Sequence, residues 1–162
     1  MTRRAISVSR YHDFSYGHRV TGHEGKCCNL HGHNGRVTFT CAAIDHLDHV
    51  GRVIDFGVIK DTLCNWVEEN WDHNFLLWEQ DPKHAQLFEL FPESIVSVPF
   101  NPTAENMADF LLLTIGPRLL KGKGVELLSV KMEETRKCSA TSSKSPLYLT
   151  ADEKPRDLLT GL

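Results

Sequence analysis

The seven residues from 27 to 33, Cys-Cys-Asn-Leu-His-Gly-His, constrain the fold of this chain more than any other feature. On an extended strand, the side chains at positions i and i+2 point to the same face. His31 and His33 can therefore reach one metal ion, while Gly32 removes bulk from the opposite face. Cys27 precedes His31 by four residues and adds a candidate thiolate base at the edge of the site. The run predicts a β-strand that carries part of a metal centre.

A third histidine is expected to join this site. His18 ends a predicted strand over residues 5–18, and a loop leads from it into a second predicted strand over residues 31–44. Consecutive strands with a modest connection usually pair antiparallel, which would bring His18 near His31 and His33. Three neutral imidazoles suit zinc and leave a fourth position open for water or substrate. The alternatives are polar surface histidines or a structural zinc site, although structural sites favour four ligands, often cysteines.

Composition and charge exclude several classes of protein. The 162 residues fit one domain over 1–162, with a loose tail at 152–162. The net charge of −3 comes without a basic block, so we expect no nucleic-acid partner. No apolar run is long enough for a membrane span and no signal peptide is visible, so we expect no membrane partner. Five cysteines, an odd number, indicate a reducing compartment, and we expect a cytoplasmic location.

The remaining pattern predicts two helices, two further strands of the main sheet and one brief additional strand. Asp55 is a suitable N-cap for an amphipathic helix over 55–70, and Asn101 or Thr103 can cap a second helix that runs to about Leu120. We expect an α+β fold with a four-stranded, mostly antiparallel sheet and both helices on one face. The other predicted segments are a loop at 71–77, an irregular stretch at 78–94 with a helical turn at 86–91, a brief strand at 96–98, a strand at 127–135, a polar loop at 139–146 and a last strand at 147–149.

Two adjacent cysteines are candidates for the thiolate. A nearby cation makes a thiol easier to deprotonate, and a thiolate can act as a base or a nucleophile. The alternatives for Cys27 and Cys28 are an inert loop thiol or a zinc ligand, and the residues alone favour neither cysteine. Cys41 and Cys64 lie in strand and helix patterns and are interpreted as core residues.

Acidic residues form the other group of candidates. In a loop, Asp72 can hydrogen-bond His73 and orient its imidazole as in a catalytic dyad, although a surface pair or a helix-terminal cap is the simpler interpretation of these two residues alone. Glu133 and Glu134 end a predicted strand, so alternation turns one of them inward. A buried carboxylate needs N–H donors, which a 2-amino-4-oxo pyrimidine edge supplies. The alternative is an exposed acidic strand end.

Together these blocks resemble the family of 6-pyruvoyl-tetrahydropterin synthase and 6-carboxytetrahydropterin synthase. Residues 14–19, Phe-Ser-Tyr-Gly-His-Arg, are similar to the family's F-x-x-x-H-R, and residues 27–34 are similar to its C-x3-H-G-H-N. Two departures stand out: Gly35 replaces the family's usual aromatic residue, and residues 78–99 form a long, irregular segment. The resemblance spans roughly residues 5–150, and its further blocks are Val53–Phe56, Asp72–Leu76, Pro102–Asn106 and Glu134–Thr135.

The resemblance implies the tunnelling fold, in which subunits join their sheets into a barrel and trimers commonly stack into hexamers. We therefore expect self-association as a homohexamer. It also implies zinc as the cofactor and a pterin triphosphate as the substrate. The implied roles are zinc binding by His18, His31 and His33, base catalysis by Cys27, proton transfer by Asp72 and His73, pterin anchoring by Glu134, and positions near the pterin for Thr103 and Glu105.

The spacing C-x3-H-G-H is typical of the family's bacterial, queuosine-pathway branch. That branch converts 7,8-dihydroneopterin triphosphate and water to 6-carboxytetrahydropterin, acetaldehyde and triphosphate, so the resemblance implies this activity. Two alternatives share the fold: 6-pyruvoyl-tetrahydropterin synthesis and side-chain cleavage by a folate-pathway aldolase. A third, of another class, is a zinc- and pterin-binding protein without catalysis.

Overall fold

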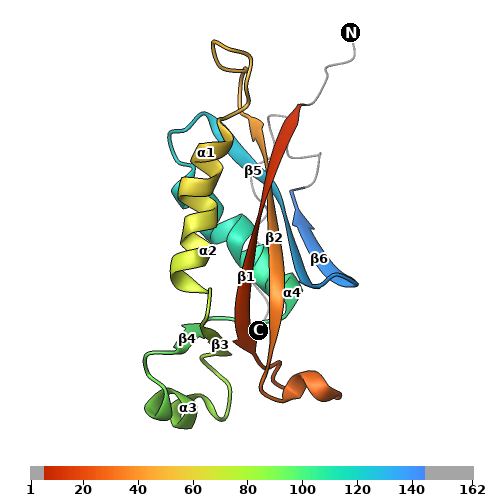
Figure 1. The fold of residues 1–162 in the computed structure, drawn as a ribbon, viewed down its shortest axis with the longest axis vertical. Coiled ribbons are helices and arrows are strands. Elements are labelled where there is room, and N and C mark those ends of the chain that lie inside the picture. The colour runs from red at the N-terminus through yellow and green to blue at the C-terminus, as the bar shows by residue number, and fades with distance from the viewer. Residues whose placement is uncertain (1–5, 145–162) are drawn as a thin grey trace, which may run out of the picture.

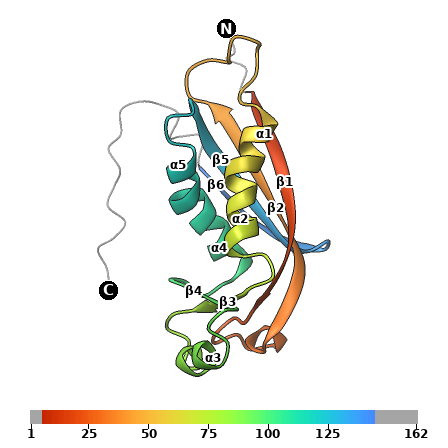
Figure 2. The same ribbon diagram turned by 60° about the vertical axis from the view of Figure 1, so that its left-hand side comes forward.

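A curled sheet with two long helices on one face forms the body of the protein (Figures 1 and 2). The computed structural model describes residues 6–144, and its six strands lie in the order β4-β3-β1-β2-β5-β6. The elements are β1 (Ser7–His18), η1 (Lys26–Cys28), β2 (His31–Ala43), α1 (Phe56–Ile59), η2 (Lys60–Cys64), α2 (Asn65–Asn70), β3 (Phe75–Trp78), α3 (His84–Leu90), β4 (Ile95–Val98), α4 (Ala104–Phe110), η3 (Leu111–Ile115), α5 (Gly116–Leu119), β5 (Val125–Thr135) and β6 (Cys138–Ser143).

The long β1–β2 ladder gives the sheet its two distinct faces. The strands pair antiparallel, and the register places His18 opposite His31. Phe14 of β1 and Val37 of β2 alternate inward and are buried against the helices. Because side chains of a strand alternate with a period of two, His18 lies on this same inner face. The predicted pairing of the first two strands is confirmed.

The two predicted helices are also confirmed, and each contains a π-helical turn. The first continues from α1 through η2 to α2, and Asp55 caps it by accepting a hydrogen bond from Gly57 N at 2.7 Å. The second begins after Thr103, whose hydroxyl accepts from Asn106 N, and continues past Pro117 into α5. No helix among residues 6–144 combines the length and apolar character needed to cross a bilayer.

The predicted four-stranded antiparallel sheet is wrong, because β3 and β4 extend it with two short parallel strands. Phe75 pairs with Gly17 of β1, and β4 continues the parallel pairing beyond β3. Leu76 and Leu77 are both fully buried, so β3 shows no apolar–polar alternation and was predicted as a loop. The brief strand predicted at 96–98 is confirmed as part of β4.

The C-terminal part of the sheet also differs from the prediction. Residues 139–143 were predicted as part of a polar loop at 139–146 but belong to β6, which pairs antiparallel with β5. Its Ser- and Thr-rich sequence suits an exposed edge strand but carries no apolar periodicity. The predicted strand at 147–149 and the predicted tail at 152–162 lie outside the described residues.

A buried carboxylate ties the loop after β1 to the β3–α3 connection. The side chain of Asp81 is fully buried and lies 3.2 Å from Arg19 Nε. It also accepts hydrogen bonds from Thr21 Oγ1 and Lys83 N. Between the two anchored loop residues, the backbone N–H of residue 20 donates to the carbonyl of Cys27 at 2.8 Å. Asp81 therefore helps to fix the backbone position of the candidate thiolate.

Candidate metal centre and active site

Three histidines converge at the end of the β1–β2 ladder. His18 Nε2 lies 3.1 Å from His31 Nε2 and 3.1 Å from His33 Nε2. The three ligand atoms all lie within 4.8 Å of one another. Strand geometry produces this cluster, because His18 and His31 are directly paired and His33 follows two residues later on the same face. The structure thus brings together all three residues that the sequence suggested as metal ligands.

The hydrogen bonds of the outer ring nitrogens leave the inner ones free to bind a cation. His18 Nδ1 donates to the carbonyl of Pro102 at 2.7 Å, and His31 Nδ1 donates to that of Asn29 at 2.8 Å. A carbonyl only accepts, so in these neutral rings both Nε2 atoms present lone pairs to each other. Ligands 2.0–2.1 Å from a tetrahedral zinc ion lie about 3.3 Å apart. The donor set and its spacing therefore fit a bound metal.

Burial keeps the central histidine neutral. The pKa of His18 is lowered to about 4, mainly by loss of solvation and also by the neighbouring His31 and His33, against the opposing effect of the Pro102 hydrogen bond. Burial also lowers the pKa of His33, while the charge of Glu134 raises it. Because a metal binds the neutral imidazole, His18 remains competent as a ligand well below neutral pH.

The same shift predicts how the metal-free protein responds to acid. Unfolded His18 takes up a proton near pH 6.5, whereas folded His18 does so only near pH 4. The unfolded state therefore binds more protons in this window, and the free energy of unfolding should fall by about 1 kcal/mol between neutral pH and pH 5.5. Urea denaturation with a chelator measures this loss. The non-titrating variant His18→Gln should lose less, and an equal loss would assign the effect to other groups.

A carboxylate lies beside the three histidines, as the alternation of β5 predicted. Glu134 Oε1 is 3.8 Å from His18 Nε2, and Glu134 Oε2 is 4.0 Å from His33 Nε2. Its side chain is about three-quarters buried. Glu133, the neighbouring residue, lines a pocket on the opposite face of the sheet.

The start of α4 also reaches the site through Pro102. Its carbonyl holds His18, and the next residue, Thr103, uses its hydroxyl as the helix N-cap. Glu105 lies in the first turn of α4 but is exposed. Thr103 is therefore adjacent to the histidine cluster, whereas no described contact joins Glu105 to it.

The two candidate cysteines lie in η1, just before β2. Cys27 and Cys28 are both partly exposed, and the Cys28 thiol approaches Asn29 Oδ1 at 3.9 Å. The carbonyl of Cys27 is held from the opposite side of the loop by the backbone N–H of Val20. Cys41 and Cys64 are buried, which confirms their interpretation as core residues.

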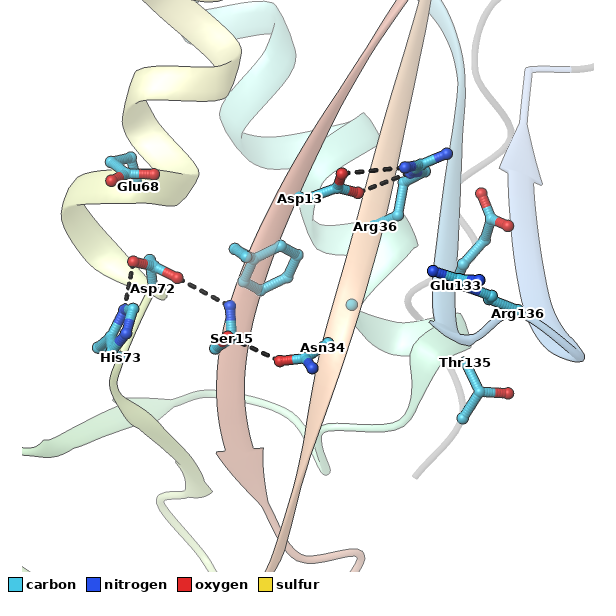
Figure 3. A pocket seen from close by; sticks show the side chains of 12 residues that line it. Asp13, Ser15, Asn34, Arg36, Glu68, Asp72, His73, Glu133, Thr135 and Arg136 are labelled. Carbon is cyan, nitrogen blue, oxygen red and sulfur yellow. Dashed lines mark hydrogen bonds and ion pairs between the residues drawn. The ribbon is translucent and has the colours of Figure 1, made fainter.

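Asp72 and His73 form a hydrogen-bonded pair along the edge of β1 (Figure 3). Asp72 Oδ2 accepts from His73 Nδ1 at 2.5 Å, and Asp72 Oδ1 accepts from Ser15 N at 2.8 Å. Burial acts to raise the pKa of Asp72, but the hydrogen bonds from Ser15 and His73 outweigh it and hold this pKa below its usual range. His73 has a positive φ of 57° and an 82% exposed side chain. The carboxylate thus stays ionised and orients an imidazole toward solvent.

This pair opens onto the face of the sheet that the helices do not cover. It lines a pocket of about 600 Å³ together with the outward-facing side chains of Asp13, Ser15 and Arg36 (Figure 3). Arg36 donates to both carboxylate oxygens of Asp13, at 2.6 and 2.9 Å. The three histidines are absent from this lining and point to the opposite, inner face. Within one chain, no described hydrogen bond or ion pair joins the dyad to the metal cluster.

Two residues of this region were missed from the sequence. Tyr16 is buried against His18 and His33, although it was assigned only to a pleated surface. Asp81 was not singled out because it lies in the irregular segment and its partners are about sixty residues away in sequence. Gly35, by contrast, was noted because it replaces the family's usual aromatic residue. This replacement was an available signal that another aromatic ring, that of Tyr16, occupies the space.

The fold and the histidine cluster define an α+β protein with a candidate metal site, and comparison identifies its family. The sequence profile of 6-pyruvoyl tetrahydropterin synthase matches residues 7–145. The chain belongs to this family, which confirms the resemblance of the motifs. The 6-carboxy-5,6,7,8-tetrahydropterin synthase of Rickettsia felis is 39% identical over 134 residues, which cover 82% of this chain and 96% of that protein. The probable enzyme of the same name from Halobacterium salinarum is 33% identical and covers 75% of each chain.

Solved structures share the fold. An uncharacterised protein of Wolinella succinogenes superposes with a TM-score of 0.79 and 27% identity, covering 88% of this chain and all of that one. The 6-pyruvoyl tetrahydropterin synthase of Caenorhabditis elegans superposes with a TM-score of 0.61 and 24% identity, covering 88% and 97%. The second likeness concerns the fold alone.

Proposed function

We propose that this chain is a cytoplasmic, zinc-dependent enzyme that converts 7,8-dihydroneopterin triphosphate and water to 6-carboxytetrahydropterin, acetaldehyde and triphosphate. The observation that carries the proposal is the cluster of three Nε2 atoms with Glu134 beside it. Relatives named 6-carboxy-5,6,7,8-tetrahydropterin synthase support this reaction over the others of the family. The four-residue spacing from Cys27 to His31 supports the same branch.

The residues of the site divide into binding and proton-transfer roles. His18, His31 and His33 would hold the zinc ion, which supplies a Lewis acid that makes hydroxyls of the substrate side chain more acidic. Glu134 would accept hydrogen bonds from the N–H groups of the pterin edge and fix the ring. Thr103 and Glu105 are proposed to lie near the ring, with Thr103 the better placed of the two.

Protons would be moved by Cys27 and by the Asp72–His73 pair. The Cys27 thiolate would act as the base that takes a proton from a carbon of the substrate side chain. His73 would exchange protons with the side-chain oxygens, and Asp72, through its 2.5 Å hydrogen bond, would hold the imidazole in one tautomer and stabilise its protonated form.

Product analysis tests the reaction directly. Zinc-loaded protein is incubated with 7,8-dihydroneopterin triphosphate and the products are identified by mass spectrometry. We expect 6-carboxytetrahydropterin with acetaldehyde and triphosphate. A pyruvoyl product or glycolaldehyde would instead assign the synthase or the aldolase reaction. Tight pterin binding without release of triphosphate would contradict catalysis.

We also propose that the enzyme assembles by joining sheet edges and that the site is shared between copies. Among the described residues, β3 pairs with β1 only at Gly17 and His18, so most of the outer edge of β1 is open, as is the outer edge of β6. Joining these edges would close several sheets into a barrel, with a homohexamer as the expected assembly. Because the dyad opens onto the outer face of its own sheet, with no described contact to its own histidine cluster, it would serve the metal centre of a neighbouring copy.

Mixing two inactive variants tests this arrangement. Cys27→Ala and His73→Ala chains, co-expressed in equal amounts, should recover activity at about one quarter of the sites if each site combines two copies. A mixture of Asp72→Asn and His73→Ala chains is the control and should remain inactive, because both changes affect the same contributed pair. Absence of recovery in the first mixture would place the whole site within one chain.

A further inference from the structure

Tyr16 lies directly against the candidate metal centre. It projects from the inner face of β1, where its Cα partner on β2 is His33, and it is only 3% exposed. The Tyr16 ring centroid lies 5.2 Å from that of His18 in an edge-on arrangement and 5.7 Å from that of His33. These are the two histidines whose Nε2 atoms lie within 4.0 Å of the Glu134 carboxylate.

A glycine on the neighbouring strand makes room for this ring. A Cβ atom at Gly35 would lie 2.7 Å from Tyr16 Cε1, which is closer than such contacts allow. The Tyr16 ring therefore crosses over β2 at Gly35, in the direction of β5, the strand that carries Glu134. Tyr16 and Gly35 form a matched pair in which the aromatic residue comes from β1 and the small residue from β2.

The Tyr16 hydroxyl has no partner within the described part of the chain. Its oxygen is buried and makes no hydrogen bond there. Leaving a buried hydroxyl unpaired costs free energy, which phenylalanine would avoid while filling the same space. The retained hydroxyl therefore implies a partner that residues 6–144 do not provide. The Tyr16 ring lies against His18 and His33, which are proposed to hold the metal, and Glu134, which is proposed to bind the pterin, lies beside these two histidines.

We propose that the Tyr16 hydroxyl donates a hydrogen bond to the bound pterin substrate beside Glu134 and the histidine cluster, and that Gly35 leaves the room that the Tyr16 ring needs. This inference rests on the proposed function and adds a substrate-binding residue to it. The hydroxyl is positioned before the ligand arrives, because Phe14 stacks on the Tyr16 ring at 5.0 Å and the two histidines flank it.

Binding of 7,8-dihydroneopterin to zinc-loaded Tyr16→Phe protein tests the proposal. The substitution removes one oxygen and keeps the ring, and we expect about tenfold weaker binding by calorimetry. Tyr11→Phe is the matched control: Tyr11 lies on the outer face of β1 and is exposed, so its loss of a hydroxyl should leave binding unchanged. Because the Tyr16 hydroxyl makes no hydrogen bond to the described residues, Tyr16→Phe should keep full zinc content and an unchanged or higher urea midpoint without ligand.

The outcomes separate this proposal from the function on which it rests. Wild-type affinity in Tyr16→Phe would overturn the substrate contact alone. Weaker binding accompanied by lost zinc or a lower urea midpoint would also overturn it, by showing a structural role. If the wild-type and Tyr11→Phe proteins bind no pterin, the proposed function itself fails. Gly35→Ala should weaken binding in the wild type but have little further effect in a Tyr16→Ala background, where the ring is absent.

Discussion

Replacement of Cys27 by alanine should lower kcat by a factor on the order of 10³ while zinc and pterin binding persist, because a positioned general base typically contributes factors of this size. The change removes only the thiol. The backbone of the loop remains held by the hydrogen bond from Val20 N to the Cys27 carbonyl and by the Asp81 contacts with Arg19 and Thr21. Acetaldehyde release measures turnover, and metal analysis measures zinc content.

Cys28→Ala is the matched control, because Cys28 belongs to the same turn and has the same intermediate burial. Its loss should leave kcat within a few-fold of the wild-type value. The reverse result, with Cys28→Ala inactive and Cys27→Ala active, would show that the spacing to His31 was assigned to the wrong cysteine. Inactivity of both variants with loss of zinc would show that the turn acts structurally.

The histidine cluster could be predicted from sequence because its geometry depends only on strand periodicity and one pairing. His31 and His33 share a face by the period of two, and an antiparallel neighbour ending at His18 completes the set. The register places His18 opposite His31, so no distant part of the chain was needed to bring the three together. The same alternation predicted that one of Glu133 and Glu134 faces inward, and the resemblance to the family indicated Glu134.

The parallel extension of the sheet could not be predicted in the same way. In β3, Leu76 and Leu77 are both buried. A short apolar run has the same sequence pattern whether it forms a strand or anchors a loop. The pairing of β3 with the end of β1 is set by contacts of long sequence separation, as is the ion pair of Asp81 with Arg19. Local patterns carry no signal for such partners.

The dyad shows how a correct local prediction can leave the site undetermined. Sequence adjacency allowed the hydrogen bond from His73 to Asp72, which the structure contains. The side of the sheet on which the pair lies depends on the left-handed backbone at His73 and on its hydrogen bond from the main-chain N–H to Ser15 O. Neither follows from the residue types, so the separation of the dyad from the histidines was not foreseen.

Replacement of His33 by alanine should remove stoichiometric zinc and reduce turnover by a factor on the order of 10³ or more, because two imidazoles remain where the proposed site needs three. His33 is the best ligand to remove, since it lies at the partly exposed side of the cluster whereas His18 is fully buried and bonded to Pro102. His49→Ala is the control, because His49 is exposed in the loop between β2 and α1.

The effect on stability distinguishes a metal ligand from a packing residue. Without metal, His33 joins the cluster by one ring contact, at 3.1 Å from its Nε2 to that of His18, and it lies at the partly exposed side. His33→Ala should therefore change the free energy of unfolding by no more than about 1 kcal/mol in a chelator. With zinc at one hundred times its dissociation constant, the wild type and His49→Ala should each gain about 2.7 kcal/mol, a gain that His33→Ala should lack. Urea denaturation with and without zinc measures both quantities.

A large loss of stability in the chelator would mean that His33 stabilises the fold by packing. If zinc does not raise the free energy of unfolding of the wild type, the close approach of the His18 and His31 Nε2 atoms has a cause other than metal binding.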